Sequence, residues 1–127
     1  MLIPKAPSPA KPVIGFAGDG AFGISMNEMS SCAREEWPAI TMVIFRNYQW
    51  GAEKRNTTLW FDNNFVGTEL DPELSYAKVA DACGLKGITV KTMEETTAAI
   101  KKSCEDQKKG KTTVSYTHLT LPTILLV

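Results

Sequence analysis

The segment VIGFAGDGA, residues 13–21, carries the strongest signal for a fold in this chain. Its first five residues are apolar or glycine and predict a short buried strand, while the glycines that flank Asp19 predict a tight turn leading into a helix. A second apolar run, ITMVIF at residues 40–45, ends shortly before Asn47. Together these segments have the length of one βαβ unit, in which a helix joins two parallel strands.

The two polar side chains at the ends of these strands indicate a binding site. In an open parallel sheet, ligands bind at the carboxyl ends of the strands, where both Asp19 and Asn47 are expected to lie. The backbone N–H groups of Gly20 and Ala21 at the helix start suit phosphate oxygens. Carboxylate and amide oxygens are ligands that Mg²⁺ prefers. A GDG tripeptide alone usually marks only a turn, so the prediction of half a cofactor site rests on the whole strand, turn, helix and strand order.

The rest of the chain alternates helical and strand-like patterns. Apolar residues at helical spacing predict that the first helix continues to residues 35–36. Asp71 has the character of an N-cap, with Pro72 in the first turn of a helix that Gly84 ends. Residues 88–90 are expected to form another strand. We therefore predict the α/β class, with a three-layer parallel sheet and helices on both faces.

Two further segments carry predictions. TMEE at residues 92–95 has the capping-box form and begins a helix. The core-facing stripe of that helix is predicted to be Met93, Thr97, Ile100 and Cys104. Residues 48–70 show little periodicity, and we expect a long binding loop. Within it, Lys54 and Arg55 are candidates to bind a phosphate or sulfonate group, with ordinary surface charge as the alternative.

Composition restricts the class of protein. The chain has 127 residues, with fourteen Lys plus Arg and fourteen Asp plus Glu, so it has no net attraction for nucleic acid or an anionic membrane. The three cysteines show no C-x-x-C spacing and are expected to be small buried residues in a reducing compartment. Residues 1–11 form a proline-rich lead without the apolar core of a signal peptide. We expect one cytoplasmic domain.

Residues 12–113, about four fifths of the chain, resemble the C-terminal, diphosphate-binding domain of the sulfoacetaldehyde acetyltransferase family. The order from GDG to asparagine is similar to the thiamine-diphosphate (ThDP) motif of a wider enzyme group. The run FRNYQWGAEKRNTTLWFDNNFVGTELDP, residues 45–72, is the most specific part of the likeness. Many ThDP enzymes have two asparagines where this chain has Arg46 and Asn47. The second asparagine is the ligand, so the resemblance implies an incomplete ThDP-binding fold whose ligand position is intact.

The resemblance also implies roles for individual residues. Mg²⁺ would be held by Asp19, Asn47 and the backbone carbonyl of Gln49. The ThDP cofactor would be bound by residues of the glycine turn and of the loop after the second strand: Gly18, Asp19, Gly20, Ala21, Asn47, Gln49, Trp50 and Gly51.

The implied reaction converts sulfoacetaldehyde and phosphate to acetyl phosphate and sulfite, using the carbanion chemistry of the cofactor. No catalytic residue is expected in this chain, because in ThDP enzymes a glutamate from the pyrimidine-binding domain of a partner subunit activates the cofactor. We therefore expect a fragment that is inactive alone, needs that domain, and comes from a homo-oligomer. Two alternatives stay open: another ThDP enzyme of the acetolactate synthase or 2-oxo acid decarboxylase type, and a stand-alone phosphate-binding α/β module.

The last residues depart from the family pattern. VSYTHLTLPTILLV, residues 114–127, resembles the out-of-frame translation of sequencing-adaptor sequence, and we expect it to be non-native. His118, the only histidine, is therefore assigned no catalytic role. Residues 112–117 nevertheless have the composition of a strand and are expected to pair at an edge of the sheet. The predicted boundaries are thus 1–11, 12–113 and 114–127.

Overall fold

The computed structural model describes residues 11–34 and 36–117; the predictions for residues 1–10 and for His118 lie outside this range. Within it, the chain forms a four-stranded sheet in the order β1-β2-β4-β3, and every neighbouring pair is parallel. The strands are β1 (Ile14–Gly18), β2 (Thr41–Phe45), β3 (Lys86–Val90) and β4 (Thr113–Thr117). The parallel sheet predicted from the alternating pattern is confirmed.

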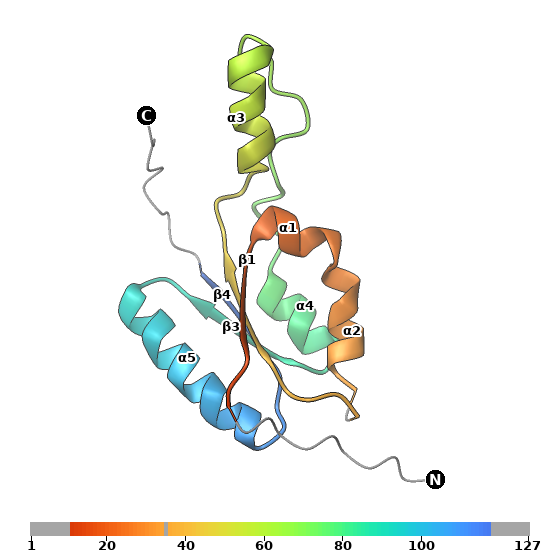
Figure 1. The fold of residues 1–127 in the computed structure, drawn as a ribbon, viewed down its shortest axis with the longest axis vertical. Coiled ribbons are helices and arrows are strands. Elements are labelled where there is room, and N and C mark those ends of the chain that lie inside the picture. Colours follow the sequence, from red (N-terminus) through yellow and green to blue (C-terminus); the bar gives the residue numbers. More distant parts are fainter. Residues whose placement is uncertain (1–10, 35, 118–127) are drawn as a thin grey trace.

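Helices cover both faces of this sheet (Figure 1). One face carries α5 (Met93–Lys108), and the other carries α1 (Asp19–Ile24), α2 (Met29–Cys32) and α4 (Tyr76–Ala82). The three-layer arrangement is therefore confirmed. The first helix is shorter than predicted, because a 3-10 turn, η1 (Met26–Glu28), interrupts it and α2 ends at Cys32. Glycine, serine and asparagine in this segment are weak helix formers, which accounts for the break.

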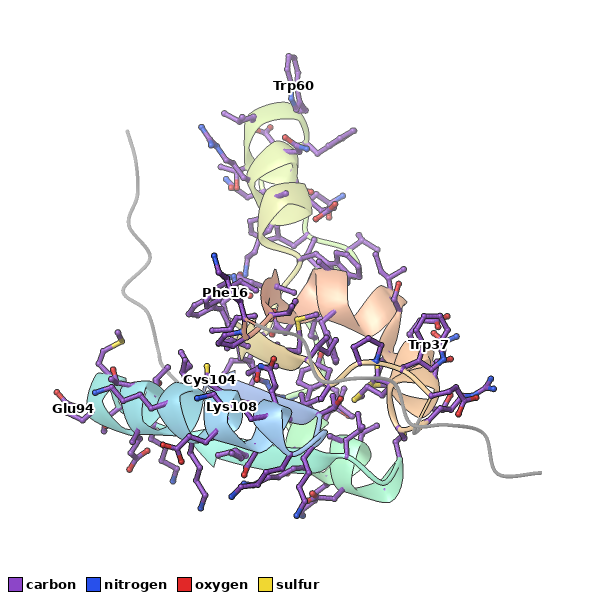
Figure 2. The ribbon with its side chains drawn as sticks, turned by 60° about the horizontal axis from the view of Figure 1, so that its bottom comes forward. Phe16, Trp37, Trp60, Glu94, Cys104 and Lys108 are labelled. Carbon is purple, nitrogen blue, oxygen red and sulfur yellow. The ribbon has the colours of Figure 1, made fainter. Side chains whose placement is uncertain are left out.

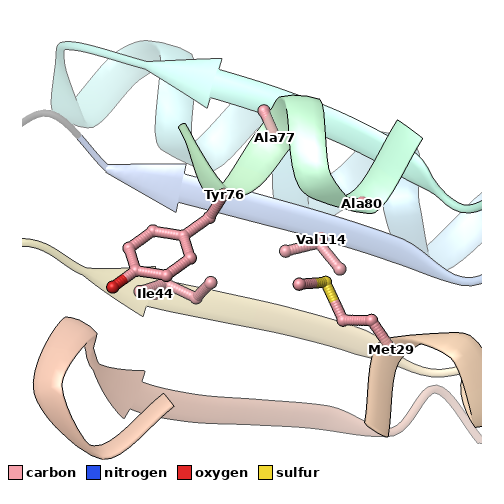
Figure 3. Packing of buried hydrophobic residues seen from close by; sticks show 6 residues of the cluster. All are labelled: Met29, Ile44, Tyr76, Ala77, Ala80 and Val114. Atoms are coloured by element: carbon pink, nitrogen blue, oxygen red, sulfur yellow. The ribbon is translucent and has the colours of Figure 1, made fainter. Parts of the chain in front are cut away.

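The apolar core lies between β2, β4 and the helices α2 and α4. Figure 3 shows its buried side chains, which come from separate parts of the chain: Met29, Ile44, Tyr76, Ala77, Ala80 and Val114. The two alanines let α4 approach the sheet closely. At Gly87 of β3 the approach is so close that an added Cβ would overlap the backbone carbonyl of Ala77.

We expect Gly87→Ala to lower the free energy of unfolding by about 3 kcal/mol, the upper end for overpacking, because α4 would have to move. Gly15→Ala is the matched control. Its Cβ would lie 3.0 Å from the end of the flexible Met42 side chain, so its effect should stay below about 1 kcal/mol. Urea unfolding followed by circular dichroism measures both; equal effects would contradict the backbone contact.

The position of β4 corrects one prediction. Residues 112–117 were expected at an edge, but β4 pairs with β2 on one side and β3 on the other. The residue types of this segment are compatible with either an edge strand or an inner strand, so only the order of the strands in the sheet distinguishes the two positions. The predicted domain boundary at residue 114 therefore falls inside the inner strand.

The helix ends are partly as predicted. At α5 the Thr92 hydroxyl accepts from the Glu95 N–H at 3.1 Å, which confirms the cap. The cap of α4 is Ser75, not Asp71: Ser75 Oγ accepts from the Lys78 N–H at 3.3 Å, whereas Asp71 Oδ1 accepts from the Glu73 N–H at 2.8 Å within a separate turn. As predicted, a glycine ends α4: Gly84 has a φ of 82°.

The buried face of α5 also differs from the predicted stripe. Met93 is 60% exposed, and the buried residues of the helix are Thr96, Ala99, Ser103, Asp106 and Gln107. The buried face of α5 is therefore the one that carries Gln107. The Gln107 side-chain amide accepts from the Val13 N–H at 2.9 Å and donates to Thr41 Oγ1 at 2.5 Å. These hydrogen bonds join the end of α5 to the starts of β1 and β2.

The predicted loop at 48–70 contains a helix instead. We call residues 49–70 the arm; it holds α3 (Gly51–Trp60), which stands away from the sheet in Figure 1 and buries none of its residues. Its base is closed by two backbone hydrogen bonds, from Trp50 N–H to Thr68 O and from Leu70 N–H to Tyr48 O, each 2.8 Å long. Trp60, near the far end of α3, is 77% exposed (Figure 2).

The three cysteines differ from their predicted environment. All three cysteines are free and half-buried, so the expectation that they are small buried residues is wrong. Burial, with help from the nearby Glu28 carboxylate, raises the pKa of Cys32 and so disfavours its reactive thiolate. None of the helices in the described ranges has the length and apolar composition needed to cross a membrane.

Candidate functional site

The register of β1 and β2 brings the two predicted ligands together. Gly18 pairs with Phe45 at the ends of these strands, so that Asp19 and Asn47 follow at the same edge of the sheet. An open cavity of about 200 Å³ lies there. It is lined by residues from the glycine turn and from the loop after β2: Gly18, Asp19, Gly20, Ala21, Phe45, Arg46, Asn47 and Gln49.

Asp19 supplies the formal negative charge at this edge. It is only 2% exposed. Its Oδ1 accepts from the Gly20 N–H at 3.1 Å, and its Oδ2 accepts from the Tyr48 N–H at 2.9 Å. Each carboxylate oxygen has room for more than one partner. The carboxylate is therefore oriented by the backbone and still has acceptor capacity toward the cavity.

The loop after β2 bends tightly around this carboxylate. Tyr48 has a φ of 62°, in the left-handed region. The bend lets Asn47 Oδ1 accept from the Gln49 N–H at 3.2 Å. Asn47 and Gln49 thus line the cavity together with the glycine turn.

Trp50 and Gly51 do not line the cavity but pack directly behind it. The Trp50 ring lies against Gly20, where an added Cβ would come within 3.1 Å of it. A Cβ at Gly51 would lie 3.4 Å from Asn47 Nδ2. The contact at Gly51 is an ordinary van der Waals distance, whereas the absence of a side chain at Gly20 allows the Trp50 ring to pack closely against the glycine turn.

The donor set fits a hard divalent cation. No cluster of three His, Cys, Asp or Glu side chains is placed to hold a metal anywhere in the described part of the chain. A cation at this edge would be bound by oxygens of the lining residues, among them the Asp19 carboxylate and the Asn47 side-chain amide. Oxygen donors of this kind, with space for water and phosphate oxygens, suit Mg²⁺.

Tyr76 holds the backbone of Asp19 by a hydrogen bond. Its hydroxyl donates to the backbone carbonyl of Asp19 at 3.1 Å. Burial is the main cause that raises the pKa of Tyr76, and the Asp19 carboxylate raises it further, while Arg46 opposes the shift. The phenol therefore keeps its proton at neutral pH and remains a donor.

The two predicted anion-binding side chains lie on the arm instead of in the cavity wall. Lys54 pairs with Glu69 at 2.5 Å, and its ammonium lies 5.1 Å from the centre of the Phe65 ring. Arg55 is exposed on α3. Lys54 lies on α3 and is not among the residues that line the cavity.

Sequence reasoning missed three residues that shape the site: Arg46, Tyr48 and Tyr76. Arg46 was noticed only as a departure from a family pattern, and Tyr48 carries no local signal for a positive φ. Tyr76 lies in the helix predicted after Pro72, and its local sequence gives no sign of a contact with Asp19. Their roles depend on contacts between segments that are far apart in the sequence.

Comparison with known proteins identifies relatives of the chain. The family model described as "Thiamine pyrophosphate enzyme, C-terminal TPP binding domain" matches residues 3–115, beyond both ends of the predicted 12–113. The chain is 75% identical over 109 residues to a probable sulfoacetaldehyde acetyltransferase of Rhizobium meliloti (strain 1021), covering 86% of this chain and 18% of that protein. It is 64% identical over 110 residues to a sulfoacetaldehyde acetyltransferase of Rhodobacter capsulatus, covering 87% and 19%.

A solved structure shows the same architecture. The thiamine diphosphate-dependent 4-hydroxybenzoylformate decarboxylase of Rhodococcus jostii RHA1 matches with a TM-score of 0.75 at 25% identity, over 86% of this chain and 20% of that one. The chain therefore spans about a fifth of the length of each of these proteins.

Proposed function

Because the chain belongs to the thiamine pyrophosphate enzymes, within their C-terminal TPP-binding domain, we propose that it supplies the diphosphate- and Mg²⁺-binding part of a ThDP-dependent acetyltransferase. The parent reaction would convert sulfoacetaldehyde and phosphate to acetyl phosphate and sulfite. The observation that carries this proposal is the cavity at the ends of β1 and β2, where Asp19, Asn47 and Gln49 meet. The 75% identity to a probable sulfoacetaldehyde acetyltransferase supports the choice of substrate.

Each residue of the site has a defined part in this proposal. Asp19, Asn47 and the Gln49 carbonyl would hold Mg²⁺, and the backbone at Gly18, Gly20 and Ala21 would face the diphosphate. Trp50 and Gly51 would keep the loop closed over the turn. When bound, the thiazolium ring of ThDP supplies the carbanion chemistry.

The proton transfer that activates the cofactor needs another group. The proposed ligands would hold a cation. Tyr76 keeps its proton, and its hydroxyl is hydrogen-bonded to the Asp19 carbonyl. We therefore propose that a pyrimidine-binding domain on a partner subunit supplies the activating glutamate, in a cytoplasmic homo-oligomer, and that this chain alone is inactive.

The alternatives are less well supported. A 2-oxo acid decarboxylase shares the fold, but the likeness to the solved decarboxylase is 25% identity, far below the 64% and 75% found with the acetyltransferases. Family membership also favours an enzyme part over a stand-alone phosphate-binding module. Lys54 and Arg55 remain candidates for a substrate anion only if the arm brings them to the site of the complete enzyme.

A chimera tests the proposal. Residues 3–115 of this chain replace the matching segment of the Rhizobium meliloti relative, and sulfite and acetyl phosphate are measured with saturating ThDP and Mg²⁺. We expect ThDP-dependent turnover by the chimera and none by the 127-residue chain alone, because only the chimera contains the remaining domains.

Gel filtration and thermal melting of the chimera provide the control for folding. A folded chimera that binds no ThDP would contradict the proposed cofactor role. Acetyl phosphate from the 127-residue chain alone, above a ThDP-only control, would contradict the proposed need for a partner domain.

A further inference from the structure

Arg46 is a buried cation in the wall of the candidate site. It follows β2 and is 3% exposed, although arginine is almost never fully buried without partners. Its guanidinium donates to three carbonyl oxygens of the turn before α4: Nη1 to Leu74 at 2.5 Å, and Nη2 to Asp71 at 2.8 Å and to Pro72 at 2.9 Å. A planar fork serves several carbonyls at once, which the single charged point of a lysine does not match.

The same guanidinium supports the loop that carries the predicted ligands. Its central carbon lies 4.2 Å from the centre of the Tyr48 ring, a cation–π geometry. Tyr48 has a left-handed backbone with a φ of 62°, which is strained for a residue with a bulky side chain. Its N–H donates to Asp19 Oδ2 at 2.9 Å. Arg46 therefore contacts Tyr48, the residue whose backbone N–H orients the Asp19 carboxylate.

A second path connects Arg46 to Asp19. The turn that Arg46 binds leads into α4, which begins at Tyr76. The Tyr76 hydroxyl donates to the Asp19 carbonyl at 3.1 Å, and the Tyr76 ring centre lies 5.8 Å from the guanidinium carbon. The carboxylate and the carbonyl of Asp19 are thus each held by a tyrosine that contacts Arg46.

We infer that Arg46 is a positioning residue for the candidate metal site, which fixes Asp19 through Tyr48 and Tyr76. This inference rests on the proposed function, because that function places a cation beside the Asp19 carboxylate. The opposing interpretation is that Arg46 only braces the turn before α4 and contributes to overall stability.

Amide hydrogen exchange in the full 127-residue chain separates the two interpretations. The variants are Arg46→Met and the milder Arg46→Lys. The control is Arg34→Met, which removes an exposed arginine that is paired with Glu36. We expect the Tyr48 amide to exchange roughly tenfold faster or more in both Arg46 variants, because the strained loop loses its support. The Val43 amide in β2 should keep its protection.

Metal affinity is the second readout, measured as Mn²⁺ binding with ThDP by electron paramagnetic resonance in the chimera. We expect Arg46→Lys to weaken Mn²⁺ binding roughly 10–100-fold, as is typical for residues that orient metal ligands. Arg34→Met should leave it unchanged. If the unsubstituted chimera binds no Mn²⁺ with ThDP, the proposed function fails, while the exchange data still decide whether Arg46 positions the loop.

Two results would overturn the inference: equal loss of protection at Tyr48 and Val43, which is the sign of a purely structural role, or unchanged exchange at Tyr48 in a folded variant. If Arg46→Met does not fold, Arg46→Lys decides, because it keeps the charge.

Discussion

Replacing Asp19 with asparagine in the chimera is expected to abolish ThDP-dependent turnover at ordinary Mg²⁺ concentrations. Asp19 is the one formally charged ligand of the proposed set, and it is 2% exposed. Asparagine keeps the shape and one acceptor oxygen but removes the charge. Loss of an outer residue that only orients a ligand typically weakens metal binding about 10–100-fold. Loss of the charged ligand itself should therefore reduce Mg²⁺ affinity by more than about a hundredfold.

Titration of ThDP with excess Mg²⁺, followed by calorimetry, measures this effect. Asp19→Ala should behave similarly, and Asn47→Ala should weaken binding less, because its oxygen is neutral. Glu94→Gln, the same kind of change at an exposed residue on α5 (Figure 2), is the matched control and should bind normally. Unchanged cofactor affinity in folded Asp19→Asn would refute the assignment of the site.

Deleting residues 113–127 from the full chain is expected to abolish cooperative unfolding. The deletion removes β4, which pairs with both β2 and β3, and leaves a gap in the middle of the sheet. It also removes Val114, which is 2% exposed in the core. Losing an inner strand and its buried side chain exceeds the about 5–15 kcal/mol margin that keeps a small domain folded.

Two variants control this experiment. Deletion of residues 118–127 keeps every strand pair of the described sheet, so the Tm should fall by no more than about 4–8 °C, the shift that 1 kcal/mol produces in a domain of about 100 residues. Val114→Asp places a charge in the core and should destabilise strongly without shortening the chain. A cooperative melt of the chain without residues 113–127 would show that β4 is dispensable, as expected for a strand at an edge.

Several features that depend on neighbouring residues in the sequence were predicted correctly, whereas features that depend on distant segments were not. The location of Asp19 and Asn47 at the same edge of the sheet was predictable because each follows a local apolar strand, and parallel strands place their carboxyl ends together. The Thr92 cap was predictable because a helix cap involves a few adjacent residues. The prediction of an Asp71 cap failed because α4 begins only at Tyr76, where Ser75 supplies the cap, and the Asp71 carboxylate accepts from the Glu73 N–H in a separate turn.

Local sequence patterns predicted the fold class, the glycine turn and the edge of the sheet where the cavity lies, since the spacing of apolar residues and the residue types of a turn are local properties of the chain. Three features depend on the folded chain: β4 is an inner strand, α3 forms an arm, and Arg46 contacts both Tyr48 and Tyr76. The physical reason is that strand order and burial of a guanidinium depend on which distant segments meet, and the free energy of those contacts has no signature in any one segment.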